Sequence, residues 1–216
     1  MRAYFISGLG ADKKAFQNIN LPRPFETIHL NWIAPLADES IASYAQRLAG
    51  QINRSESFIL IGLSFGGLIA TEIAKIIPPY KLVLISSAAT RKELPLSMRF
   101  AGLCKLEKLL PYKSLRKPGR LLNYAFSPLD NNSRQIIHAM IAASDPNFIK
   151  WAIKAVLHWN NKKKPANLLQ IHGDKDKIFP GKNAKSAIMM HGGGHFCVYS
   201  HGAVISSLIV NNCTPE

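Results

Sequence analysis

The feature that most constrains this chain is a change of hydrophobic pattern within residues 57–77. Residues 58–61, Phe-Ile-Leu-Ile, are apolar without alternation, which is typical of a strand covered on both faces in the middle of a parallel sheet. Residues 65–77 are apolar except for one narrow polar stripe, which is typical of a buried helix. The chain therefore passes directly from a buried strand into a buried helix, which predicts an α/β fold.

Short aliphatic and β-branched runs recur along the chain, and most are followed by a turn signal and a helical stretch. This alternation predicts a mostly parallel sheet of about six strands with helices on both faces. The predicted strands are residues 3–7, 25–30, 57–62, 81–86, 167–172 and 186–190. Besides 65–77, helices are expected at 39–52 and at 206–212 with the residues before them.

The alternation stops after the strand at 81–86, and residues 91–165 have helical periodicity and no convincing strand. We expect one structural domain, with a core formed by residues 1–90 and 166–216 and a helical lid formed by 91–165. One lid helix has a clear start, with Asp145 as N-cap and Pro146 at its first position. Trp151 and Trp159 then either pack in the ordinary way or face the substrate.

Positive charge is concentrated in the predicted lid. The chain has a net charge of +14, and residues 91–165 contain 15 Lys and Arg against 4 Asp and Glu. Such a field could attract anionic substrates, nucleic acid or an acidic membrane surface, or it could only keep the protein in solution. The solvated surface is slightly favoured, and no nucleic-acid partner is expected.

Residues 62–66, Gly-Leu-Ser-Phe-Gly, lie where the buried strand turns into the buried helix. A serine hydroxyl at such a turn projects from a strained backbone, and Gly62 and Gly66 leave room where strand and helix pass close together. Two glycines around a serine are common by chance, so the position carries the signal. Ser64 is predicted to be a nucleophile, with an incidental serine in a glycine-rich turn as the alternative.

An acid and a base follow in the order that such a serine requires. The acid is Asp174 or Asp176, of which Asp176 is favoured because it lies further along its loop, whereas Asp174 could only shape the turn. The base is His195, which follows a predicted strand and three glycines, with His191 as its rival. The two histidines do not predict a metal site, because three intervening glycines oppose the helix that would align them.

An acyl-transfer site also needs N–H donors for the oxyanion. Phe65, directly after the nucleophile, supplies one backbone N–H. The turn after the first strand supplies the second, for which Leu9 is the candidate.

Together these segments resemble the α/β-hydrolase superfamily over essentially the whole chain: the turn at Ser64, the acid loop at 174–180, His195 and the lid after the strand at 81–86. Ser7-Gly8 stands where the family often has His-Gly, which keeps the backbone donor and removes a bracing side chain. The resemblance implies the α/β-hydrolase fold and a hydrolase of esters or thioesters.

Two-step acyl transfer is the predicted mechanism, with Ser64 as nucleophile, His195 as general base and Asp176 orienting the histidine. No metal or cofactor is expected.

A carboxylesterase for small to medium acyl chains is favoured, and a thioesterase acting on acyl-CoA or another anionic carrier is the second interpretation. A ligand-binding protein or receptor that kept the fold is the alternative of another class. The oligomeric state stays open.

Cysteine usage and the first residues bear on location. Cys104, Cys197 and Cys213 are far apart and odd in number, so we expect small, buried, reduced thiols. Residues 12–14, Asp-Lys-Lys, interrupt the first apolar stretch, which argues against a signal peptide. No segment approaches the roughly 20 apolar residues of a membrane span. A cytoplasmic location is predicted.

Overall fold

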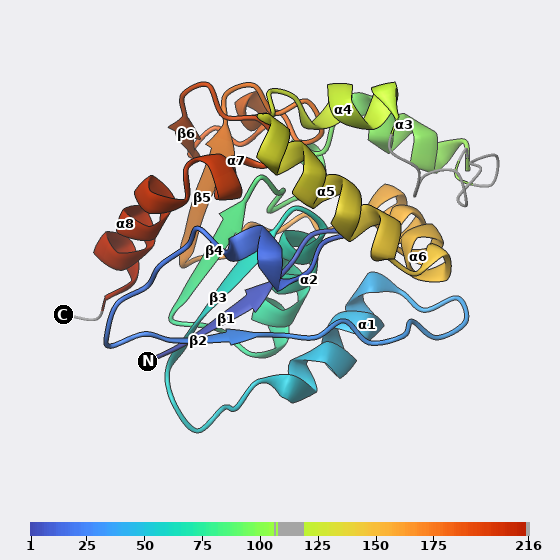
Figure 1. Cartoon of the computed structure of the whole chain (residues 1–216). Coiled ribbons are helices and arrows are strands. Elements are labelled where there is room, and N and C mark those ends of the chain that lie inside the picture. The colour runs from blue at the N-terminus through green and yellow to red at the C-terminus, as the bar shows by residue number, and fades with distance from the viewer. Residues whose placement is uncertain (106, 108–118, 215–216) are drawn as a thin grey trace.

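The computed structural model describes residues 1–105, 107 and 119–214, and Figure 1 shows a single sheet with helices on both of its faces. The sheet has the strand order β2-β1-β3-β4-β5-β6, and every neighbouring pair is parallel. The strands are β1 (Arg2–Ile6), β2 (Glu26–His29), β3 (Phe58–Leu63), β4 (Lys81–Ile85), β5 (Leu168–Gly173) and β6 (Ile188–Met190). All six predicted strands are confirmed to within two residues at each end.

The chain changes direction across the sheet between β1 and β3. From β1 it goes outward to β2, then crosses back to β3 on the other side of β1. Ile6, at the end of β1, is in register with Gly62, near the end of β3. In open parallel sheets, ligands bind at the carboxyl edge beside such a switch point.

Each face of the sheet has its own apolar core, because successive residues of β3 point to opposite faces. Leu60 packs with side chains of α1 (Ile41–Leu48), α2 (Phe65–Ile76) and α6 (Pro146–His158). Ile59 and Ile61 pack with α5 (Asn131–Ala143), α7 (Cys197–Ser200) and α8 (Gly202–Cys213). The buried helix predicted at 65–77 is confirmed as α2, and that predicted at 39–52 is α1 followed by the short helix η2 (Ala49–Gln51).

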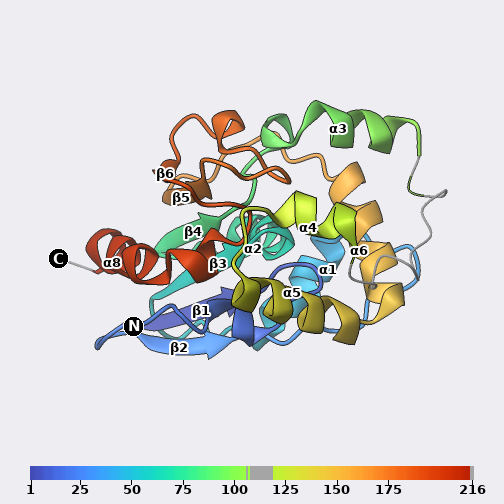
Figure 2. The ribbon, with the colours of Figure 1, turned by 45° about the horizontal axis from the view of Figure 1, so that its top comes forward.

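The described part of residues 91–165, called here the helical segment, joins β4 to β5. It consists of η3 (Arg91–Glu93), α3 (Leu96–Leu103), α4 (Arg120–Phe126), α5 (Asn131–Ala143) and α6 (Pro146–His158). Figures 1 and 2 show α3 to α6 gathered at the end of the sheet toward which the strands point. As predicted, the Asp145 side chain caps α6 by accepting from the Asn147 N–H, and Pro146 occupies the first turn.

Two further short helices, η1 (Lys13–Phe16) and η6 (Gly181–Asn183), lie in the loops after β1 and β5. Within the described ranges, no helix combines the length and the apolar character needed to cross a bilayer. The three cysteines are unpaired; Cys197 and Cys213 are buried as expected, but Cys104 is exposed just after α3, so that expectation was wrong. Burial raises the pKa of Cys197 to about 12 and that of Cys213 to about 11.

Candidate active site

Ser64 lies at the turn between β3 and α2 with φ 51° and ψ −120°, a strained conformation for a residue with a side chain. The neighbouring glycines make this turn possible. A Cβ on Gly62 would come within 2.5 Å of the Gly67 Cα, and one on Gly66 would overlap the carbonyl oxygens of Ile6 and Ser7 at the end of β1. Strand and helix backbones therefore touch here, as the sequence predicted.

Both backbone groups of Ser64, the N–H and the carbonyl, are hydrogen-bonded to β4 and the residues that follow it. The Ser64 N–H donates to the carbonyl of Ile85 at 2.9 Å, and the Ser87 hydroxyl donates to the Ser64 carbonyl at 2.6 Å. Sequence analysis missed Ser87. The sequence did contain a clue: Ser87 comes directly after the predicted strand at 81–86, so it reaches the same edge of the sheet as Ser64.

Three distant segments meet at this edge. His195 Nε2 lies 2.8 Å from Ser64 Oγ, and His195 Nδ1 lies 2.9 Å from Asp176 Oδ2. The histidine and the aspartate are both buried. The structure thus brings together Ser64, His195 and Asp176 in one hydrogen-bonded chain.

The imidazole of His195 is held by more than its two hydrogen bonds. The second carboxylate oxygen of Asp176 accepts the N–H groups of Ile178 and Phe179 at 2.8 and 2.9 Å, which fixes the carboxylate. The Phe179 ring stacks on the imidazole at 5.7 Å, and the Phe126 ring meets it edge-on at 5.4 Å. A histidine fixed in this way keeps one orientation toward the serine.

The rival acid and base contact each other instead. His191 Nδ1 lies 3.0 Å from Asp174 Oδ2, and the His191 side chain is almost fully exposed. Asp174 is hydrogen-bonded through its backbone N–H to Met190, so it belongs to the turn after β5. This pair lies at the surface, away from the serine hydroxyl.

The two predicted oxyanion donors lie at the same place. A Cβ on Gly8, beside Leu9, would come within 3.4 Å of the Ser64 Cβ, so the first loop runs close to the serine. Leu9 and Phe65 line one cavity together with Ser64 and His195. Among the described residues, neither the Leu9 nor the Phe65 N–H donates to another protein group.

That cavity has a volume of about 260 Å³, and its lining residues come from the carboxyl edge of the sheet and from the helical segment. Of the described residues that line it, Ser64 and His195 alone have polar side chains. A smaller cavity of about 30 Å³ shares Leu9, Ser64 and His195. The apolar lining of the larger cavity consists of Leu9, Gly10, Phe65, Met98, Leu122, Phe126, Ile141, Ile149, Ile153, Val156, Leu157, Ile178 and Phe179.

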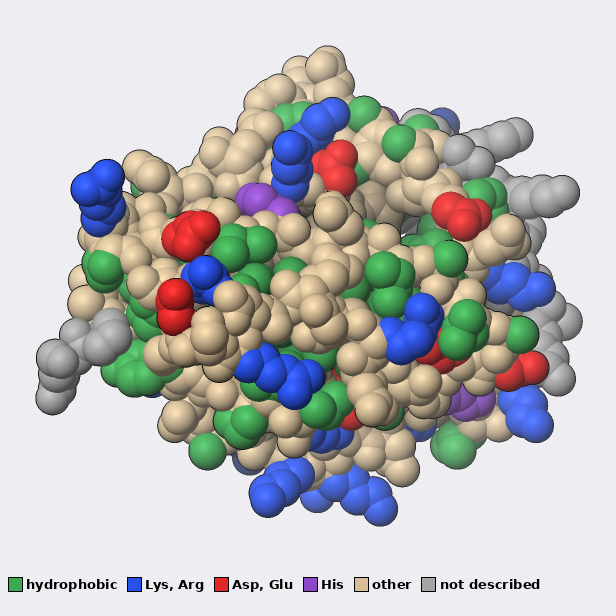
Figure 3. Space-filling model, turned by 90° about the horizontal axis from the view of Figure 1, so that it is seen from below, with side chains coloured by type: hydrophobic (Ala, Val, Ile, Leu, Met, Phe, Trp, Pro, Cys, Tyr) green, Lys and Arg blue, Asp and Glu red, His purple; other side chains and the backbone are tan. Residues whose placement is uncertain are grey.

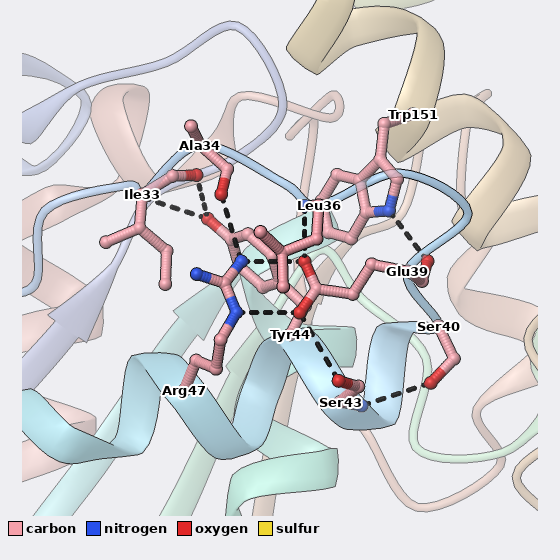
Figure 4. A network of polar contacts seen from close by, with 9 residues as sticks. All are labelled: Ile33, Ala34, Leu36, Glu39, Ser40, Ser43, Tyr44, Arg47 and Trp151. Atoms are coloured by element: carbon pink, nitrogen blue, oxygen red, sulfur yellow. Dashed lines mark hydrogen bonds and ion pairs between the residues drawn. The ribbon is translucent and has the colours of Figure 1, made fainter.

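Trp151 and Trp159 do not line this cavity, so the expected substrate contact is not observed. Both are buried, and a buried indole N–H needs an acceptor. The Trp151 N–H donates to the Glu39 carbonyl at 2.9 Å, in the network around Arg47 and Tyr44 shown in Figure 4. The Trp159 N–H, just beyond α6, donates to the Glu72 carboxylate at 2.7 Å. Both side chains join α6 to the core.

Sequence analysis also missed a buried histidine behind the acid loop. His172, on β5, is almost fully buried, and neither ring nitrogen has a hydrogen-bond partner among the described residues. Burial lowers its pKa, which the negative charge of Asp176 partly opposes. Its place in an apolar strand gave no sign that it would lie beside the acid.

Comparison with known proteins supports the fold. No family model and no curated protein matches the sequence. An esterase from Thermogutta terrifontis superposes with a TM-score of 0.77 at 16% identity, covering 98% of this chain and 88% of the esterase. The enol-lactonase from Burkholderia xenovorans LB400 superposes with a TM-score of 0.76 at 13% identity, covering 99% of this chain and 91% of the lactonase. MenH from S. aureus superposes with a TM-score of 0.73 at 18% identity, covering 98% of this chain and 92% of MenH.

At these identities the likeness concerns the fold alone. The chain has the α/β-hydrolase fold, with one parallel six-stranded sheet flanked by helices, as the resemblance in sequence implied.

Proposed function

We propose that this protein is a serine hydrolase that cleaves carboxylic esters through an acyl-enzyme on Ser64. The observation that carries the proposal is the hydrogen bond of 2.8 Å between His195 Nε2 and Ser64 Oγ at the wall of an apolar cavity. A strained serine whose hydroxyl already meets a buried, oriented imidazole is the arrangement that nucleophilic catalysis needs. The esterase and the enol-lactonase of the same fold agree with this class of reaction.

In the proposed reaction the Ser64 oxygen attacks the carbonyl carbon while its proton passes to His195 Nε2. The backbone N–H groups of Leu9 and Phe65 donate to the oxyanion that forms. His195 then gives the proton to the departing alkoxide, and the acyl group remains on Ser64. A water molecule, deprotonated by the same nitrogen, then attacks the acyl carbon. The bond to the Ser64 oxygen breaks, that oxygen takes the proton back from Nε2, and the acid leaves; Asp176 stabilises the imidazolium in both steps.

The cavities favour an ester with one larger apolar part. Among the described residues, no Lys, Arg, Asp or Glu lines the space of about 260 Å³, which suits a small to medium acyl chain, with the helical segment acting as a lid. The adjoining space of about 30 Å³ suits a small group on the other side of the carbonyl.

A thioesterase acting on an anionic carrier is the second candidate, favoured by the basic excess of residues 91–165. A binding protein that kept the triad is the alternative of another class. We keep the cytoplasmic location as a prediction from the sequence.

Labelling with a fluorophosphonate probe tests the proposal. Wild-type protein is expected to be labelled, and Ser64→Ala is not, because the probe reacts with an activated serine hydroxyl. Asp174→Asn is the control and keeps its labelling. Equal labelling of the wild type and Ser64→Ala would contradict the proposal that the protein is a serine hydrolase.

Measured kcat/KM values then separate the substrate classes. Across p-nitrophenyl esters of increasing chain length, we expect a maximum at short to medium chains and a fall beyond the length that the cavity holds. A higher kcat/KM for acyl-CoA than for the p-nitrophenyl ester of the same acyl group would favour the thioesterase.

A further inference from the structure

Helix α3 turns an apolar face outward. Leu96, Phe100 and Leu103 are 74%, 63% and 75% exposed. Their spacing places all three side chains on one side of the helix. Helices at a protein surface ordinarily turn polar residues to solvent, so this face is the reverse of the usual pattern.

The inner side of α3 is taken up by contacts with the cavity and with α6. Met98 lines the cavity beside Ser64. Gly102 lies so close to α6 that a Cβ there would overlap the Leu157 carbonyl oxygen. Figure 2 shows α3 at the outer edge of the molecule. The three apolar side chains therefore stay outside when α3 is in place.

Three basic side chains lie on α3 or next to it in the chain. Lys92, in η3 just before α3, and Lys105, two residues after it, are exposed, and Arg99 is half-buried on the helix. In residues 91–105, no ion pair joins any of these three to a carboxylate of the described chain.

The acidic side chains of the same stretch are used elsewhere. Glu93 accepts from the Ala89 N–H and from Gln170, and Glu107 is buried against His158. Among the described residues of 91–107, the exposed charge is therefore positive, within the part of the sequence that carries most of the basic excess.

We propose that the outward face of α3, formed by Leu96, Phe100 and Leu103 with Lys92, Arg99 and Lys105 around it, docks onto an anionic lipid bilayer. Apolar side chains of a short surface helix enter the boundary between headgroups and acyl chains, while flanking cations meet anionic headgroups. A nucleic acid would use the cations but offer its phosphates to the apolar side chains. A second copy would bring like charges together. The lipid surface alone complements both features.

Sedimentation with vesicles tests this surface on the full chain, with no need for hydrolysis. The wild type is expected to sediment with vesicles of phosphatidylcholine mixed with phosphatidylglycerol, and more weakly with phosphatidylcholine alone. The variant Leu96→Ser/Phe100→Ser/Leu103→Ser should bind the anionic vesicles about 100-fold more weakly, since apolar burial drives insertion. Lys92→Gln/Arg99→Gln/Lys105→Gln should bind about 10-fold or more weakly and lose its preference for anionic lipid.

The matched control is Leu36→Ser/Ile76→Ser/Val204→Ser, which removes exposed apolar side chains of the core region. It should bind as the wild type does, and thermal unfolding verifies that each variant is folded. Failure of the wild type to bind anionic vesicles, or equal binding by both apolar variants, overturns the proposal. Two further results would also overturn it, each in the absence of vesicle binding. One is salt-sensitive retention of the wild type on DNA, and the other is a dimer that only Leu96→Ser/Phe100→Ser/Leu103→Ser fails to form.

Discussion

The core beneath Ser64 and the helical segment above it are packed in different ways. At the serine, backbone touches backbone: a Cβ on Gly62 or on Gly66 would overlap backbone atoms of a neighbouring segment. Above it, the cavity is enclosed mainly by side chains of α3 to α6, such as Met98, Ile149 and Val156. Backbone contacts admit few alternatives, whereas side-chain contacts adjust to a change of volume. The position of the nucleophile is therefore fixed more tightly than the shape of the space that receives the substrate.

The surfaces of the two regions differ as well. Outside residues 91–165 the chain has 12 Lys and Arg against 9 Asp and Glu, and Figure 3 shows basic and acidic side chains interspersed on the face seen from below. The helical segment is strongly basic, and its helix α3 exposes apolar side chains. In our two proposals, the core carries the chemistry and the helical segment makes the contact with a membrane.

The largest expected effect is on the hydrogen-bonded chain of the core. Asp176→Asn should lower kcat/KM by about 10⁴-fold, because the amide no longer holds His195 in the tautomer that accepts the serine proton. Asp174→Asn, two residues away and paired with His191 at the surface, should stay within about threefold of the wild type. Hydrolysis of a p-nitrophenyl ester measures both. Similar losses in the two variants would mean that the acid loop acts as a whole rather than through Asp176.

Next comes the backbone contact beneath the serine. Gly66→Ala should destabilise the fold by about 3 kcal/mol or more, since the new methyl group meets the carbonyl oxygens of Ile6 and Ser7, which the sheet holds in place. Gly50→Ala is the control, because a Cβ there meets nothing within 4 Å. Urea unfolding, or soluble yield if the variant does not fold, gives the measurement. A small effect at Gly66 would show that the strand and helix can separate.

A third change tests whether the helical segment yields where the core does not. Gly102→Ala also places a methyl group against a backbone carbonyl, that of Leu157, but α3 lies at the surface and can move outward. We expect a cost of about 1 kcal/mol, well below that at Gly66. Urea unfolding of both variants provides the comparison. Equal costs at the two glycines would contradict the contrast between the regions.

Smaller still is the effect of side-chain volume in the cavity. Met98→Ala should shift the preferred p-nitrophenyl ester toward longer chains, with a change of about threefold to tenfold in relative kcat/KM. Leu96→Ala, on the outward side of the same helix, should leave the chain-length profile as it is. A profile unchanged by Met98→Ala would place the acyl chain elsewhere.

The smallest effect concerns pH. Burial lowers the pKa of His172 below its ordinary value of 6.5, so at lower pH the unfolded chain binds a proton that the folded protein does not. The free energy of unfolding should therefore fall as the pH falls from 6.5 toward the lowered pKa. His172→Gln should flatten this dependence, with part remaining from His29, whose pKa burial and Lys13 also lower. Parallel curves for wild type and variant, from unfolding at several pH values, would exclude the contribution of His172.

Much of this protein could be predicted from its sequence, because local rules agree with the fold in the core. The continuous apolar run of β3 gave a central strand, and the glycines around Ser64 gave the sharp turn, since each signal depends on near neighbours in the chain. The helix start at Asp145 and Pro146 was readable for the same reason. The serine, the acid and the base could be assigned in that order because each lies in the loop that follows a successive predicted strand.

Only the tertiary structure decided which side chains meet. In the sequence Asp174 and Asp176 differ by two positions, yet one turns inward to His195 and the other outward to His191. The sequence left Trp151 and Trp159 between ordinary packing and a substrate contact, and the structure shows their N–H groups donating to Glu39 and Glu72, which lie far away in the chain. Periodicity fixes which face of an element is apolar, whereas its partner in space depends on packing between distant segments, which no local pattern encodes.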